Sequence, residues 1–295
     1  MLVGFVFVAL LLGFLLGYRL ILGESLGIKR FLKEQIDQAL VLANHNRIIA
    51  NNKGDFTNVV FLHHSVGRNL IDEGGVREIL HIHHVDFWDQ DYSWRGLRDP
   101  LGKAAGFSYT IPGDNTDPDG LVDIFSQDVR SVPTNAISQL FQHETIILKS
   151  CFPTSNIPDD LVLNQRKSEY QTVREKMVQY PDHLFILVTQ PPLTPELTTI
   201  DSAARARELA DWLKSPEFIG DARNIMVFDL FDYLAIPPDV EQSPNTLKPE
   251  YQNGQDAHPN TLANKNIGPK FADFILRAIE DYRGINSTRP IANSN

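Results

Sequence analysis

Cysteine is almost absent from this chain of 295 residues, in which Cys151 is the only one. A single cysteine excludes an intramolecular disulfide framework and a cysteine-rich zinc site, and it leaves the redox compartment open. The sequence also lacks a stripe of lysine and arginine, and its formal net charge is −10. Because a nucleic-acid surface must neutralise phosphates, these absences predict that the protein has no nucleic-acid partner.

Internal repeats and established metal motifs are missing as well. Five histidines lie between residues 63 and 84, and His81 and His83 would share one face of a strand, with Asp86 or Asp89 as a further ligand. No HExxH sequence or other established zinc spacing accompanies them. A polar edge or pocket rim is therefore the favoured interpretation, and we expect neither a metal nor an organic cofactor.

An apolar segment opens the chain, and residues 1–18 carry no charged side chain. Its length approaches the roughly 20 apolar residues of a membrane-spanning helix. We expect residues 1–22 to form an uncleaved transmembrane anchor, with a cleaved signal peptide as the alternative. The basic residues follow this run, which favours a cytoplasmic domain, whereas a misassigned start codon would remove that argument. The sequence thus predicts a single-pass membrane protein and leaves the side of the membrane open.

The rest of the chain divides by composition and periodicity. Residues 23–55 are expected to form an amphipathic stalk and linker, residues 56–283 one domain, and residues 284–295 a polar, flexible tail. The strand-like runs are 57–64, 81–88, 144–150, 183–189 and 224–230, and the helix-like patterns are 66–80, 134–142, 160–180, 201–214 and 262–282. Near-continuous apolar strands that alternate with helices predict a three-layer α/β/α sandwich with a mostly parallel sheet of about five strands.

Polar residues with catalytic chemistry follow these strands, at the edge where a parallel sheet binds ligands. Ser65 comes directly after the first strand, where it could be a nucleophile or only the N-cap of a helix. Asn156 follows the strand 144–150, and its amide could donate to an oxyanion or belong to an ordinary turn. His258 precedes the last helix, where it could be incidental or a general base oriented by Asp256. Together the three positions favour the catalytic interpretation.

The order of these residues resembles that of the SGNH (GDSL-like) hydrolase superfamily, over roughly residues 57–282. Ser65 matches the family nucleophile, with His-His-Ser where many members have Gly-Asp-Ser. His258, followed by Pro259-Asn260 and a helix, matches the catalytic histidine. The resemblance implies the flavodoxin-like fold of that family and an ester hydrolase with an acyl-enzyme intermediate.

The oxyanion residues match the family less closely. The resemblance assigns Asn156 as the oxyanion asparagine, although the usual Gly-x-Asn-Asp sequence is absent. It assigns Gly120 as the oxyanion glycine, with Gly113 and Gly96 as alternatives.

The acidic partner of the histidine departs from the family pattern. Members of the family carry it three residues before the histidine, a position that Gln255 occupies here, whereas Asp256 stands two residues before His258. We expect Asp256 to orient His258, and Gln255 or a backbone carbonyl are the alternatives. Because the residue before Ser65 is His64, that side chain is a possible extra donor or alternative base.

The segment 89–120 is rich in glycine, aspartate, asparagine and aromatic residues. It is too long for a simple connection, which predicts a functional insertion or lid, with a surface loop as the alternative. Trp94, Arg95 and Asn115 from this segment, together with His64, are the candidate substrate-binding residues.

These observations predict a serine hydrolase that cleaves an acyl or acetyl ester. An acyltransferase with the same residues and a non-catalytic envelope module with the same fold are the alternatives. The expected substrate is an acylated small molecule, glycan or lipid, and the N-terminal helix adds the membrane as a partner.

Overall fold

The computed structural model describes residues 26–92, 95–113, 117–254 and 256–287. The transmembrane anchor predicted for residues 1–22 lies outside these ranges. Among the described helices, none combines the length and the apolar character that crossing a membrane requires.

Six strands form one sheet in the order β3-β2-β1-β4-β5-β6. Their bounds are β1 Asn58–Leu62, β2 Asp86–Gln90, β3 Leu97–Arg98, β4 Thr145–Lys149, β5 Leu184–Val188 and β6 Ile225–Phe228. All neighbouring strands are parallel except β2 and β3, which are antiparallel. The predicted α/β fold with a mostly parallel sheet is confirmed, and the short β3 brings the strands to six.

The strand order places a ligand site at one edge of the sheet. The chain runs outward from β1 to β2 and β3, and it then returns to β4 on the other side of β1. Open parallel sheets bind ligands outside the carboxyl ends of the strands, where the strand order reverses. The residues that follow β1 and β4 therefore lie at the position where the topology favours a site.

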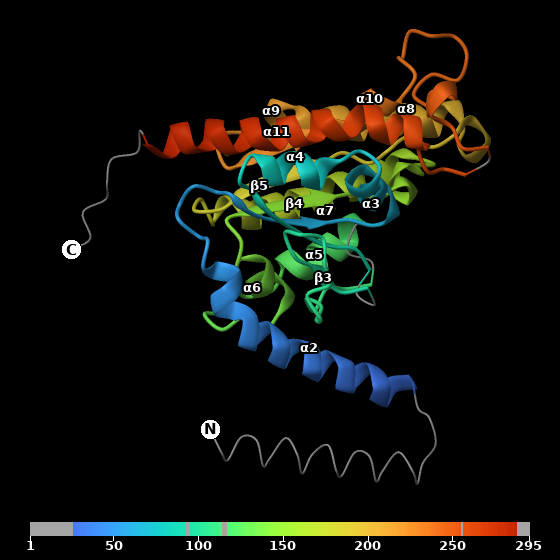
Figure 1. Cartoon of the computed structure of the whole chain (residues 1–295). Helices are drawn as coiled ribbons and strands as arrows, with labels where there is room; N and C mark the ends of the chain where they lie inside the picture. The colour runs from blue at the N-terminus through green and yellow to red at the C-terminus, as the bar shows by residue number, and fades with distance from the viewer. Residues whose placement is uncertain (1–25, 93–94, 114–116, 255, 288–295) are drawn as a thin grey trace, which may run out of the picture.

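Alternate residues of each strand pack on opposite faces of the sheet. On one face, the helices are α3 Ser65–Asp72, α4 Val76–Ile82, α10 Leu230–Leu234 and α11 Thr261–Ser287. On the other, they are α5 Pro118–Phe125, α6 Ala136–Leu140, α7 Asp160–Val178, α8 Ile200–Lys214 and the short α9 Pro216–Ile219. Figure 1 shows α4 and α11 on one side of the sheet, and α5 and α6 on the other.

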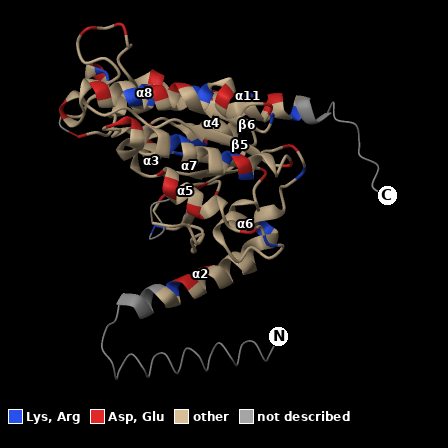
Figure 2. Cartoon of the chain, turned by 180° about the vertical axis from the view of Figure 1, so that it is seen from behind, with Lys and Arg blue, Asp and Glu red and all other residues tan. Residues whose placement is uncertain are grey.

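Charged residues lie mostly on the helices and loops around the sheet (Figure 2). All positions of β1, β4 and β5 are buried, and nearly all of them are apolar. Lys149, at the end of β4, is an exception with 1% of its surface exposed. The sheet is therefore an apolar layer that carries one buried cation at the edge where the site is expected.

Two glycines divide the helix that was predicted over residues 66–80. Gly75 adopts a φ of 69°, in the left-handed region that favours glycine, and it separates α3 from α4. A Cβ added to Gly74 would lie 2.8 Å from the Cα of Gly268 in α11, and one added to Gly268 would lie 2.5 Å from the Cα of Gly74. The two backbones touch, which fixes the α3–α4 turn against α11.

The strand predicted over residues 81–88 is wrong in its first half. Helix α4 continues to Ile82, and β2 begins only at Asp86. His81 therefore lies in a helix and His83 caps its end, so the two do not share a strand face. Among the residues that the structure describes, no three or more His, Cys, Asp or Glu side chains gather in a way that could hold a metal ion.

Helix α2 Leu26–Ile49 accounts for most of the predicted stalk. Its second half packs against the domain, since Val41 and Ile48 are buried in the core beside α5 and α6. His45 Nδ1 also lies 2.8 Å from Gln142 Oε1. The C-terminal half of this segment is thus attached to the domain, and Lys33 in its first half reaches Ser108 at 3.4 Å.

The described part of segment 89–120 is packed into the molecule. Phe107, Tyr109 and Ile111 are buried in the core. The amide of Gln90, on β2, accepts from the Tyr109 N–H at 2.8 Å and donates to the Tyr109 carbonyl at 3.2 Å. These contacts attach residues 107–111 to β2, while Leu101 and its neighbours after β3 remain exposed. At the other end of the chain, α11 continues to Ser287, beyond the predicted domain boundary at residue 283.

A buried histidine makes stability depend on pH. Burial lowers the pKa of His143 to about 3, and its ring bonds to the hydroxyl of Tyr109 at 2.7 Å and to the amide oxygen of Asn58 at 2.8 Å. In the unfolded chain a histidine titrates near 6.5, so below that pH the unfolded state binds the extra proton and stability falls as the pH falls.

The expected result is a stability deficit of His143→Gln that shrinks as the solution is acidified. Urea unfolding at pH 7, 5.5 and 4.5 should show the wild type losing about 1.4 kcal/mol more per pH unit than the variant in the acidic part of this range. A deficit that stays constant from pH 7 to 4.5 would contradict a neutral, buried His143.

Candidate active site

Ser65 lies where β1 ends and α3 begins. The N-cap of α3 is His64, and no side chain caps the helix, so Ser65 is the first helical residue. The alternative interpretation of Ser65 as an N-cap is therefore wrong. Its backbone N–H is one of those at a helix start that have no acceptor within the helix. The serine thus presents both a hydroxyl and a backbone donor at the carboxyl edge of the sheet.

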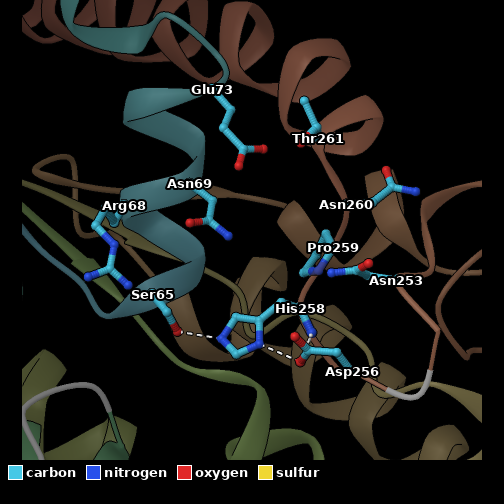
Figure 3. Close-up of a pocket in the computed structure, with 10 residues that line it drawn as sticks. All are labelled: Ser65, Arg68, Asn69, Glu73, Asn253, Asp256, His258, Pro259, Asn260 and Thr261. Carbon is cyan, nitrogen blue, oxygen red and sulfur yellow. Dashed lines mark hydrogen bonds and ion pairs between the residues drawn. The ribbon is translucent and has the colours of Figure 1, made fainter.

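The Ser65 hydroxyl is hydrogen-bonded to His258. Its Oγ lies 2.6 Å from Nε2 of His258, and Nδ1 of the same ring lies 2.6 Å from Oδ1 of Asp256 (Figure 3). Because the carboxylate can only accept, Nδ1 carries the ring proton and Nε2 is left to accept from the serine. These three residues, which are predicted from the sequence as a set, are brought together by the fold.

The two-residue spacing between acid and histidine has a local explanation. Oδ1 of Asp256 accepts from the His258 backbone N–H at 3.0 Å as well as from the ring. These hydrogen bonds lower the pKa of the Asp256 carboxyl below its ordinary value. The tight turn thus brings the carboxylate to the ring without the extra residue that the family pattern contains.

Packing on the other side of the ring holds His258 in place. The ring of Phe152 meets it edge to face, with 5.1 Å between the centroids. The chain that follows is fixed by Asn260, whose side chain donates to two backbone carbonyls and accepts from the Ala263 N–H at 3.0 Å. The side chains of Asp256 and His258 remain 50% and 26% exposed, so the acid stands in water while the base is partly covered.

Two cavities adjoin the Ser65–His258 pair. The larger, of about 300 Å³, lies between α3 and the start of α11 (Figure 3). It is lined by Ser65, Arg68, Asn69, Glu73, Asn253, Asp256, His258, Pro259, Asn260 and Thr261. The smaller, of about 170 Å³, is lined by His64, Ser65, Tyr92, Asp117, Cys151, Phe152, Pro153 and His258. The first is almost wholly polar, and the second has aromatic walls.

The two residues assigned to an oxyanion hole lie in α5 and at the end of a 3-10 helix. Gly120 is buried inside α5, and its N–H donates to the Asp119 carboxylate at 2.9 Å. Asn156 follows the 3-10 helix Phe152–Ser155, where its side chain is exposed. Neither residue lines a cavity beside Ser65. Of the alternatives, Gly96 lines a separate cavity near β3, whereas the Ser65 N–H at the start of α3 lies at the site.

The lowered pKa of His64 argues against this residue as the general base. Burial lowers the pKa of His64 to about 4, and its ring stacks on Tyr92 with 4.2 Å between centroids. A histidine with so low a pKa is neutral at pH 7 and a weak base. Burial also lowers the pKa of Lys149 to about 8, and its ammonium donates to the Ser150 carbonyl at 2.6 Å. The site therefore lies next to a neutral imidazole and a poorly solvated cation.

The remaining substrate-binding candidates are divided between two places. His64 lines the smaller cavity, as expected of a residue next to Ser65. Arg95 lies by the cavity near β3 and approaches Asp91 to 3.7 Å. Trp94 and Asn115 lie outside the described residues.

Sequence reasoning missed several residues around Ser65. Cys151 and Phe152 lie two and three residues after the end of β4, so the strand-end rule that selected Ser65 would also have selected them, whereas Asn156 lies farther along the loop. Tyr92 follows β2 and was missed because that strand was placed too early. Asp117, which accepts from the Thr154 hydroxyl at 2.8 Å, carries no sequence signal that distinguishes it.

Comparison with known proteins gives distant structural likeness and no sequence family. No protein-family model and no curated protein sequence matches this chain. A solved structure of a proposed acylhydrolase from Bacteroides fragilis NCTC 9343 is similar over 75% of this chain and 87% of its own, with 12% identity and a TM-score of 0.47. A proposed platelet activating factor from Streptococcus pneumonia is similar over 86% of this chain and 100% of its own, with 11% identity and a TM-score of 0.43.

Proposed function

We propose that this protein is a serine hydrolase that cleaves a carboxylic ester with a short acyl group. The observation that carries the proposal is the chain of two hydrogen bonds, each of 2.6 Å, from the Ser65 hydroxyl to His258 and from His258 to Asp256. A serine activated by a base, which is itself oriented by a third group, is the arrangement of nucleophilic catalysis. The resemblance of the residue order to SGNH hydrolases supports the same activity.

The geometry supports a two-step reaction. Ser65 Oγ bonds to the carbonyl carbon of the ester while its proton passes to Nε2 of His258, and Asp256 stabilises the imidazolium that forms. The oxyanion lies near the Ser65 N–H at the start of α3. When the intermediate collapses, the alcohol leaves with the proton from Nε2. Water then attacks the acyl-enzyme, His258 takes its proton, and the acid and the free serine are regenerated.

The chemistry of the cavities supports a short acyl group and a polar alcohol. The smaller cavity of about 170 Å³ is below the roughly 300–1,000 Å³ of ordinary ligand pockets, so it would hold an acetyl-sized group and no long chain. In the larger cavity, Arg68, Asn69, Asn253 and Thr261 offer hydrogen-bonding side chains, and most of the lining is polar. An alcohol with several hydroxyl groups fits such a lining better than a lipid.

Turnover of matched esters by the wild-type protein tests this function. We expect p-nitrophenyl acetate to be hydrolysed with a kcat/KM at least about tenfold above that of the octanoate, because a chain that does not fit loses transition-state binding. Activity should persist in excess EDTA, and a fluorophosphonate should label the protein. A preference for the long chain would overturn the substrate class, and loss of activity to EDTA with restoration by zinc would overturn the serine mechanism. Product analysis with an added sugar acceptor separates hydrolysis from acyl transfer.

A further inference from the structure

The histidine two residues before Ser65 belongs to a buried polar network. His63 is wholly buried, and its Nε2 lies 3.0 Å from Oδ2 of Asp89 on β2. Its Nδ1 lies 2.8 Å from the carbonyl oxygen of His64. The Asp89 carboxylate also receives the guanidinium of Arg77. His63 thus connects a carboxylate in the sheet to the peptide bond that precedes the serine.

Both partners of the His63 ring are acceptors. A carboxylate oxygen and a carbonyl oxygen can each receive a proton and cannot donate one, so both contacts are hydrogen bonds only when both ring nitrogens are protonated. Burial by itself would raise the pKa of Asp89, but the hydrogen bond from His63 and the charges of His63 and Arg77 lower it below the ordinary value. Asp89 is therefore the anion that holds the ring.

The first turn of α3 is shaped to receive this ring. A Cβ added to Gly67 would lie 2.3 Å from the Cβ of His63 and 2.7 Å from its Cγ, closer than side chains approach. Any residue other than glycine at position 67 would displace either the ring or the helix start. In the sequence His-His-Ser-Val-Gly, Gly67 therefore leaves the space that the His63 ring occupies below Ser65.

We propose that His63 is a positioning residue that fixes the His64–Ser65 peptide so that the Ser65 N–H points at the developing oxyanion. The His64 carbonyl oxygen accepts both from the His63 ring and from the Arg68 N–H at 3.0 Å, so both of its lone pairs are used. A trans peptide is planar, with its N–H directed opposite to its C=O. Holding the carbonyl inward therefore directs the N–H outward. The inference rests on the proposed hydrolase function.

Kinetics of His63→Phe and Asp89→Asn test this role. We expect each variant to lower kcat for p-nitrophenyl acetate by about 100-fold with KM close to the wild-type value, as for loss of one oxyanion donor. Inhibition by a short alkyl boronic acid, which forms a tetrahedral adduct on the serine, should weaken by a similar factor. Because both variants act through one peptide, the double variant should be scarcely worse than either single variant.

His143→Phe is the matched control. His143 is also a buried histidine with two hydrogen bonds, but it precedes β4 at the opposite edge of the sheet, so its loss should lower the unfolding midpoint and leave kcat and boronate affinity unchanged. Wild-type kcat in folded His63→Phe or Asp89→Asn, or an equal kcat loss in His143→Phe, would overturn the inference. A wild type without turnover or fluorophosphonate labelling would overturn the proposed function instead. If His63→Phe does not fold, the kcat and boronate affinity of Asp89→Asn, which conserves side-chain volume, test the inference.

Discussion

Replacing Ser65 with alanine is expected to lower kcat for short-chain ester hydrolysis by roughly 10⁴- to 10⁶-fold and to abolish labelling by a fluorophosphonate. The substitution removes the oxygen that bonds to the substrate carbonyl and leaves the rest of the site in place. Stability should change little, because Ser65 is only partly buried and, among the described residues, its hydroxyl bonds to His258. Stopped assays with concentrated enzyme and intact-protein mass spectrometry of the labelled adduct provide the measurements.

Ser126→Ala provides a matched control for this variant. Ser126 is an exposed serine at the end of α5 and lines neither cavity beside Ser65, so its loss should leave turnover and labelling at the wild-type level. His258→Ala should lose about as much activity as Ser65→Ala, and the double variant little more, since nucleophile and base act as one unit. Labelling that survives the loss of Ser65 would place the nucleophile elsewhere.

Asp256→Asn is expected to lower kcat by roughly 10²- to 10⁴-fold with a small effect on KM. A neutral amide does not stabilise the imidazolium, and its NH₂ group can turn toward Nδ1, which would place the proton on Nε2 and block acceptance from Ser65. The roughly 10⁴-fold loss of kcat is the value expected for a buried aspartate. Because half of the Asp256 side chain is exposed, water screens its charge and we expect a loss nearer the lower value.

Glu250→Gln makes the same change of charge nearby, on an exposed side chain of the chain segment that leads to His258. Its kcat should equal that of the wild type, and steady-state kinetics of the two variants over several substrate concentrations separate kcat from KM. A loss of less than about threefold in Asp256→Asn, against the roughly 10²-fold expected for a supporting acid, would mean that another group orients His258.

The fold could be predicted in those segments whose hydrophobic pattern matches their burial in the structure. The runs around β1, β4, β5 and β6 are apolar at nearly every position, which is the signature of strands covered on both faces. The structure buries β1, β4 and β5 throughout and the edge strand β6 in part. The segment 81–88 misled because His81 and His83 alternate with apolar residues at strand spacing. The pair Gly74-Gly75 gives the missing signal, since a left-handed Gly75 starts a new helix whose buried Val76 and Leu80 are four residues apart.

The site could be predicted only as far as residues whose place follows from strand ends and helix starts. Ser65 and His258 are adjacent to such elements, and Asp256 is tied to His258 by a turn of two residues. Gly120 and Asn156 were selected by residue type, and neither belongs to the residues that line the two cavities beside Ser65. The role of His63 depends on Asp89, a contact across two strands that the sequence alone does not reveal.

The backbone contact between Gly74 and Gly268 has a consequence for how this protein could change. Ser65 begins the helix that ends at this contact, and His258 precedes α11, which crosses it; Glu73 and Asn264 add a hydrogen bond of 2.8 Å beside it. Ser65 and His258 are thus attached to the starts of two helices that touch each other at this contact. We therefore expect a side chain introduced at Gly74 or Gly268 to disturb the distance between Ser65 and His258 more than a substitution in a cavity loop that carries neither residue.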